Sequence, residues 1–178
     1  MMSSFFYVLW PGDDELCIPL AMIGFYDRER DRLLMARDRV RDWSTPRLEV
    51  ESDELVDYHP NDLGMRLCSP RMRDVIDAGS GPKDDLQWLP AEVVDIFGTE
   101  HDYFILHLPG DDDVLNKTRS ILDDYGVIKP VLSAEKVEGR QLLRCPGAAL
   151  TWFVSTDLRR KLETAGITGV HFERVTTD

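Results

Sequence analysis

The sequence predicts a single compact α+β domain, covering residues 1–178, with a mainly antiparallel sheet and two principal helices. Short runs of β-branched and aromatic residues that end at turn-forming residues are typical of strands. Two other segments begin with a serine and carry apolar residues at helical spacing. With 178 residues, 43% of them hydrophobic, the chain can bury roughly 70% of the surface that it would expose when unfolded. We therefore expect one domain with one sizeable core.

The N-terminal part of the chain predicts extended structure. Residues 5–10 are aromatic and β-branched and stop at Pro11 and Gly12, so they indicate a strand followed by a turn. Residues 17–26 predict another extended segment. Arginine and aspartate alternate through residues 27–43 around a few apolar positions, a pattern compatible with either a short helix or a twisted pair of strands.

The first predicted helix begins at Ser69 and Pro70. The serine can cap the helix, and proline suits the first helical position because its missing N–H would have no partner there. Gly79 can close this helix. The residues expected on its buried face are Met72, Val75 and Ile76.

The second predicted helix follows Ser155, runs to Ala165 and has Gly166 as its C-terminal cap. We expect Leu158, Leu162 and Ala165 to line its buried face.

Residues 88–97 and 103–108 predict an antiparallel hairpin, because two β-rich runs flank a turn at residues 98–100. Further short strands are expected at residues 127–132, 141–145 and 169–175. Residues 78–85 (AGSGPKDD) combine small and turn-forming residues, so we interpret them as a loop joint within the single domain.

The formal net charge of -12 is concentrated in the middle of the chain, where residues 42–124 hold 20 acidic and 7 basic residues. Such a surface repels nucleic acid and anionic lipid, and it steers a basic protein towards itself. The alternative interpretation is that the acidity serves only solubility.

Cellular location follows from what the sequence lacks. No apolar run reaches the ~18–20 residues that a membrane span needs, and no basic leader precedes the first predicted strand. The three cysteines, Cys17, Cys68 and Cys145, are widely spaced and form neither a disulfide framework nor a metal-binding pair. We therefore expect a cytoplasmic protein.

Residue patterns for catalysis or metal binding are weak. His101 and His107 would lie on one strand ~20 Å apart at ~3.3 Å per residue, too far to share a metal ion. His59 in a loop and His171 in the last strand have no nucleophile beside them in the sequence. The acidic run at residues 111–113 lacks the ligand spacing of a calcium loop. We expect no enzymatic activity, no cofactor and no bound metal.

Several segments resemble the myxobacterial-type immunity-protein family of bacterial polymorphic toxin systems, formerly a domain of unknown function. The order of the segments carries the resemblance, which spans residues 7–10, 67–70, 87–93, 103–106, 153–155 and 164–172. It implies a cytoplasmic antitoxin-like protein that binds and neutralises a cognate toxin domain, without activity or cofactor. Residues 27–42 and the acidic cluster near Asp111 depart from the family, which marks them as places where this chain is specialised for its own partner.

The acidic middle of the chain is the predicted partner-binding region, because charge complementarity accelerates association and rejects wrong partners. Exposed acids in turn-rich loops supply the electrostatic contacts, and one tryptophan is a candidate anchor: Asp84, Asp85, Trp88, Asp111, Asp112 and Asp113. Two alternatives remain: a small enzyme with an uncatalogued carboxylate site, and an acidic nucleic-acid mimic or adaptor. The oligomeric state is not determined by the sequence.

Overall fold

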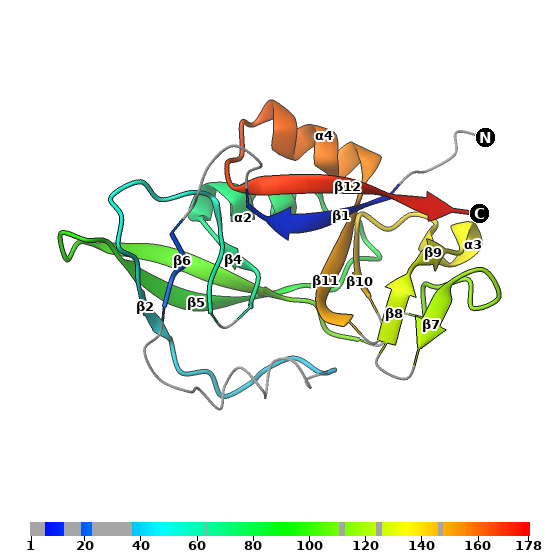
Figure 1. Ribbon diagram of the computed structural model, residues 1–178, viewed down its shortest axis with the longest axis horizontal. Helices are drawn as coiled ribbons and strands as arrows, with labels where there is room; N and C mark the ends of the chain where they lie inside the picture. Colours follow the sequence, from blue (N-terminus) through cyan, green and yellow to red (C-terminus); the bar gives the residue numbers. More distant parts are fainter. Residues whose placement is uncertain are drawn as a thin grey trace.

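The computed structural model describes residues 6–12, 19–22, 37–62, 64–110, 113–123, 126–145 and 148–178, and it confirms the α+β class. The described residues form two five-stranded sheets, one two-stranded sheet and three helices, with most strand pairs antiparallel (Figure 1). The predicted segments at residues 17–26 and 27–43 lie largely outside this description. Residues 37–43, which are described, form neither helix nor strand.

The first sheet brings the two ends of the chain together. Its strands, in spatial order, are β10 (Leu142–Cys145), β11 (Ala148–Ser155), β1 (Phe6–Pro11), β12 (Val170–Thr177) and β9 (Val131–Leu132). The N-terminal strand β1 lies between β11 and β12 and is antiparallel to both. Only the short pairing of β12 with β9 is parallel among the described strands of this sheet.

The second sheet contains the predicted hairpin. Its strands, in spatial order, are β2 (Arg47–Glu49), β5 (Gln87–Val94), β6 (Glu100–His107), β4 (Leu67–Cys68) and β3 (Tyr58–His59). β5 and β6 are antiparallel over their whole length, from the pair Gln87 and His107 to the pair Val94 and Glu100. A separate small hairpin consists of β7 (Ile121–Asp123) and β8 (Gly126–Lys129).

Both predicted helices begin at the expected serines. The helices are α2 (Pro70–Gly79), the one-turn α3 (Ala134–Val137) and α4 (Thr156–Thr164). The Ser69 hydroxyl accepts a hydrogen bond from the Met72 amide, and the Ser155 hydroxyl accepts one from the Leu158 amide, both at 3.1 Å. Each bond satisfies one of the N–H groups that a helix start leaves without a partner.

The C-terminal end of α4 differs in one detail from the prediction. Gly166 has a φ of +63° and follows the capping residue Ala165, as expected for a glycine that ends a helix. Ala165 itself is exposed, so its assignment to the buried face was wrong. The regular helix ends at Thr164 and the chain turns at Ala165, so the Ala165 side chain does not continue the buried face of α4.

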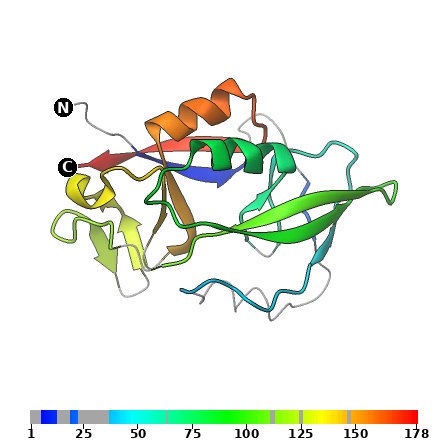
Figure 2. The ribbon, with the colours of Figure 1, turned by 180° about the vertical axis from the view of Figure 1, so that it is seen from behind.

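The main core lies where the two sheets and the two long helices meet. α2 packs against β4 and β6, α4 packs against β1 and β11, and the helices contact each other (Figures 1 and 2). The residues of this inner cluster include Leu9, Cys68, Met72, Ile76, Leu106, Trp152, Val154, Leu158 and Leu162. Two further clusters cover the opposite faces of the sheets. Alternate residues on a strand therefore enter different clusters: Leu9 packs in the inner cluster, whereas Val8 packs on the other side.

Candidate functional site

The predicted contact residue Asp84 is half-buried and bound to the backbone of its own chain. Its carboxylate accepts hydrogen bonds from the backbone amides of Gly81, Gln141 and Leu142 at 2.7 to 3.2 Å. These bonds tie the connection between α2 and β5 to the start of β10. Asp84 therefore has a structural role that sequence reasoning did not foresee.

The other described contact residues also have partners within the chain. Asp85 pairs with Arg39, and Asp113 pairs with Lys117 and Lys136 at 3.4 and 2.9 Å. Trp88 packs partly against the inner cluster, and its indole N–H donates to Asp77 at 2.8 Å. Asp111 and Asp112 lie outside the described residues. Their part in partner binding stays a prediction.

A different surface stands out at the end of the β5–β6 hairpin. The two strands project away from the helices, and their connection forms one end of the molecule's long axis (Figures 1 and 2). At this connection Ile96 is 59% exposed, and Phe97, at 77%, is the most exposed large hydrophobic residue in the described part of the chain.

Asp95 fixes the backbone that presents these two side chains. One carboxylate oxygen accepts hydrogen bonds from the amides of Phe97 and Thr99, both at 2.9 Å, and the other lies 3.0 Å from His101 Nε2. The turn closes with a bond from the Gly98 amide to the Asp95 carbonyl, and Gly98 has a φ of +80° that glycine tolerates without strain. The bond with His101 and those with the two amides hold the pKa of Asp95 below its ordinary value.

Two chain segments with exposed acidic residues flank this turn. The segment after β2 runs alongside it, because the Val50 amide donates to the Val94 carbonyl at 2.9 Å and the Ile96 amide donates to the Ser52 carbonyl at 3.2 Å. We call the exposed acids of this segment and of β6 the acidic rim: Glu51, Asp53, Glu54, Glu100 and Asp102. Arg47 is a local cation and bridges Glu92 and Glu100 at 3.0 and 2.6 Å. We call Ile96, Phe97 and the acidic rim together the hairpin end.

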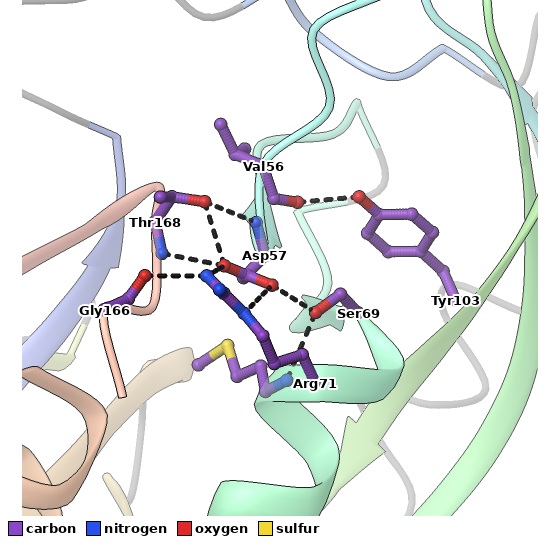
Figure 3. A network of polar contacts seen from close by, with 8 residues as sticks. Val56, Asp57, Ser69, Arg71, Tyr103, Gly166 and Thr168 are labelled. Carbon is purple, nitrogen blue, oxygen red and sulfur yellow. Dashed lines mark hydrogen bonds and ion pairs between the residues drawn. The ribbon is translucent and has the colours of Figure 1, made fainter. Parts of the chain in front are cut away.

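A second polar cluster, centred on Asp57, is a structural cross-link (Figure 3). The buried Asp57 carboxylate accepts hydrogen bonds from Ser69, Arg71 and Thr168. Arg71 also donates to the Gly166 carbonyl at 2.6 Å. The cluster therefore joins the start of α2 to the turn between α4 and β12. Burial alone would raise the pKa of Asp57, but the bonds from Arg71, Ser69 and Thr168 outweigh burial and hold it below its ordinary value.

The histidines are bound into the fold in different ways. His101 and His107 share β6 as predicted; His107 contacts the Asp38 carbonyl at 2.9 Å. His59 lies buried in β3 and not in a loop, and its Nδ1 donates to the Pro60 carbonyl at 3.0 Å. Burial lowers the pKa of both His59 and His107. His171 is exposed on β12.

Within the described ranges, no three His, Cys, Asp or Glu side chains converge on a possible metal site. No helix in the described part of the chain combines the length and the apolarity needed to cross a membrane.

No protein-family model matches the chain, and no curated protein matches it. Sequence reasoning assigned Ile96 and Phe97 to the end of a strand and missed the hairpin end. The sequence did carry a signal for it, because Asp95 and Gly98 are a residue pair typical of a tight turn. Such a turn places the two residues between them, Ile96 and Phe97, at its tip, where no other element is expected to cover them.

Proposed function

We propose that this protein is a cytoplasmic, non-catalytic immunity protein that neutralises a cognate bacterial toxin domain by binding it with the hairpin end. The observation that carries the proposal is the highly exposed Phe97, whose backbone is held by Asp95 at a turn flanked by two acidic chain segments. The resemblance to the immunity-protein family supplies the class of partner.

The hairpin end combines an apolar centre with a charged periphery, as protein interfaces commonly do. A large aromatic side chain that enters a partner's pocket can dominate the binding energy, while polar groups around it exclude water and set specificity. Because the Asp95 bonds already order the turn, little conformational entropy is lost on binding. The acidic rim favours a partner whose pocket is bordered by lysine or arginine.

The decisive experiment replaces Phe97 and measures protection. Cells that produce the candidate toxin encoded beside this chain's gene are scored for survival with wild-type protein or with Phe97→Asp, and the affinity of the purified pair is measured. We expect Phe97→Asp to lower affinity by at least about 100-fold, equivalent to about 2.7 kcal/mol, and to abolish protection without changing the thermal midpoint.

A matched control is available on the β7–β8 hairpin at the opposite end of the molecule (Figure 1), where Ile128 is 63% exposed. Ile128→Asp adds the same charge on a similarly exposed residue and should leave protection intact. If Ile128→Asp abolishes protection and Phe97→Asp does not, the binding surface is the other hairpin. If the wild-type protein neither binds the toxin nor protects the cells, the immunity function itself is wrong.

A further inference from the structure

A groove of about 590 Å³ lies between α2 and α4, on the helical side of the molecule. Val75, Ala78 and Ala165 supply small apolar side chains to its lining, and Arg71, Arg160 and Lys161 supply cationic ones. Its size is typical of binding sites. The groove belongs to a different part of the fold from the hairpin end.

Close packing of the two helices creates the groove. A Cβ atom at Gly79 would come within 2.5 Å of Leu158 Cδ1, so glycine at this position leaves room for the Leu158 side chain between α2 and α4. Behind the groove, Met72, Ile76, Leu158 and Leu162 are buried in the inner cluster. The smaller residues Ala78 and Ala165 remain on the outside, where the backbone of a third element can come close.

The cations around the groove contrast with the net charge of -12 of the whole chain. Arg71 is oriented by its ion pair with Asp57, yet its side chain is 55% exposed. Arg160 forms a solvent-exposed ion pair with Asp157 at 3.5 Å, and its side chain is 70% exposed. Lys161 donates a hydrogen bond to the Ala78 carbonyl at 3.3 Å. The lining also contains one acidic residue, Asp74, so its cationic residues outnumber its acidic ones by three to one.

We propose that this groove binds an amphipathic helix of a partner protein whose apolar face is bordered by glutamate and aspartate. A helix suits the site because the groove is lined from Arg71 to Ala78 on α2 and from Arg160 to Ala165 at the end of α4, about 10 and 8 Å at ~1.5 Å per residue, enough for about two turns of a third helix. The three cations select carboxylates at the borders of that helix. This inference does not depend on the immunity function.

The test uses a fluorescein-labelled 18-residue amphipathic peptide with leucine and alanine on one face and glutamate on the other, and its counterpart with lysine in place of glutamate. We expect the full-length protein to bind the glutamate peptide at least 10-fold more tightly than the lysine peptide. Arg160→Glu combined with Lys161→Glu should remove that binding, and Ala165→Phe should weaken it by filling the groove. Lys117→Glu combined with Lys129→Glu makes the same charge change elsewhere and should have little effect.

Several results would overturn the proposal: no binding of the glutamate peptide, equal binding of both peptides, or equal loss in the control pair. Binding of phosphatidylglycerol vesicles through Arg160 and Lys161, with no peptide binding, would assign the groove to a lipid surface. Self-association that Arg160→Glu combined with Lys161→Glu abolishes, again without peptide binding, would assign it to a second copy of this chain. Each result leaves the Phe97 experiment unaffected.

Discussion

Asp57 illustrates how one residue can hold distant segments together. Its backbone and side chain contact Ser69 at the start of α2 and Thr168 before β12, residues 12 and 111 positions away in the chain. Asp57→Asn keeps the size of the side chain but removes the negative charge with which Arg71 forms an ion pair and to which Ser69 donates a hydrogen bond. We expect a loss of about 2 kcal/mol in the free energy of unfolding, measured by urea denaturation at pH 7, with little change for the exposed Asp53→Asn.

The same residue predicts an acid-sensitive contribution to stability. The pKa of Asp57 is lower in the folded chain than its ordinary value of about 4. The stability that it contributes is therefore complete above that ordinary value and is lost as the pH falls through the folded pKa. The difference in unfolding free energy between wild type and Asp57→Asn should shrink below about pH 4; a difference that stays constant from pH 7 to pH 3 would contradict this assignment.

Gly169 is a second residue whose importance is set by its neighbours. It has a φ of +73°, and a Cβ atom there would lie 2.6 Å from the Tyr58 carbonyl oxygen and 2.8 Å from Val56 Cγ2. Gly166 has a similar φ of +63° with no heavy atom within 4 Å of such a Cβ. Gly166→Ala should cost about 1 kcal/mol through backbone strain alone, and Gly169→Ala at least about 1.5 kcal/mol more through overlap. Equal losses in thermal or urea unfolding would show that the overlap is relieved.

At the scale of the element, the β5–β6 turn depends on Asp95. Asp95→Ala removes the acceptor of the Phe97 and Thr99 amides and the contact with His101, while Phe97 itself is retained. Because the turn then has to be ordered on binding, we expect toxin affinity to fall about 10-fold with Phe97 unchanged. Titration calorimetry should show a less favourable binding entropy.

Acid should have a similar effect on the same turn in the wild-type protein. The pKa of Asp95 is lowered in the fold. The ionised carboxylate therefore orders the turn fully at a pH above the ordinary pKa of an aspartate, and this ordering is lost as the pH falls through the pKa of Asp95 in the folded chain. An unchanged affinity for Asp95→Ala would mean that the turn is ordered by Gly98 and the strands alone.

At the scale of the whole molecule, the negative charge should govern the rate of association. Glu51→Gln, Asp53→Asn and Glu54→Gln together remove three charges beside Phe97. We expect association with the toxin to slow several-fold at low salt and its dependence on salt to flatten, with little change in the dissociation rate. Stopped-flow or biosensor kinetics at 20 and 200 mM salt measure both effects.

The triple change Asp111→Asn, Asp112→Asn and Asp113→Asn tests the acidic loop that the sequence analysis favoured. It removes the same number of charges from a cluster of which Asp113 already pairs with Lys117 and Lys136. The hairpin-end proposal expects this protein to associate nearly as fast as wild type. A larger effect here than at the acidic rim would move the interface to the acidic loop.

Several local features of the fold were predictable from the residues alone. Ser69 with Pro70, Ser155 and Gly166 mark helix ends because their effects depend on hydrogen bonds and backbone angles within a few residues. The β5–β6 hairpin was predictable for the same reason, since its two strands are joined by a short turn. The order of residues also shows directly that the negative charge is concentrated in the middle of the chain.

Which side chains are available to a partner depends on how distant parts of the chain pack together. Asp84 is an acid in a turn-rich loop by sequence, but its bonds to Gln141 and Leu142 come from residues more than 50 positions away. Phe97 is an apolar strand residue by sequence, and its exposure results from the absence of any described element above the turn. The groove between α2 and α4 likewise requires two helices from distant parts of the chain to meet at Gly79. Exposure and long-range contact depend on how distant segments pack, and local residue patterns carry no information about that packing.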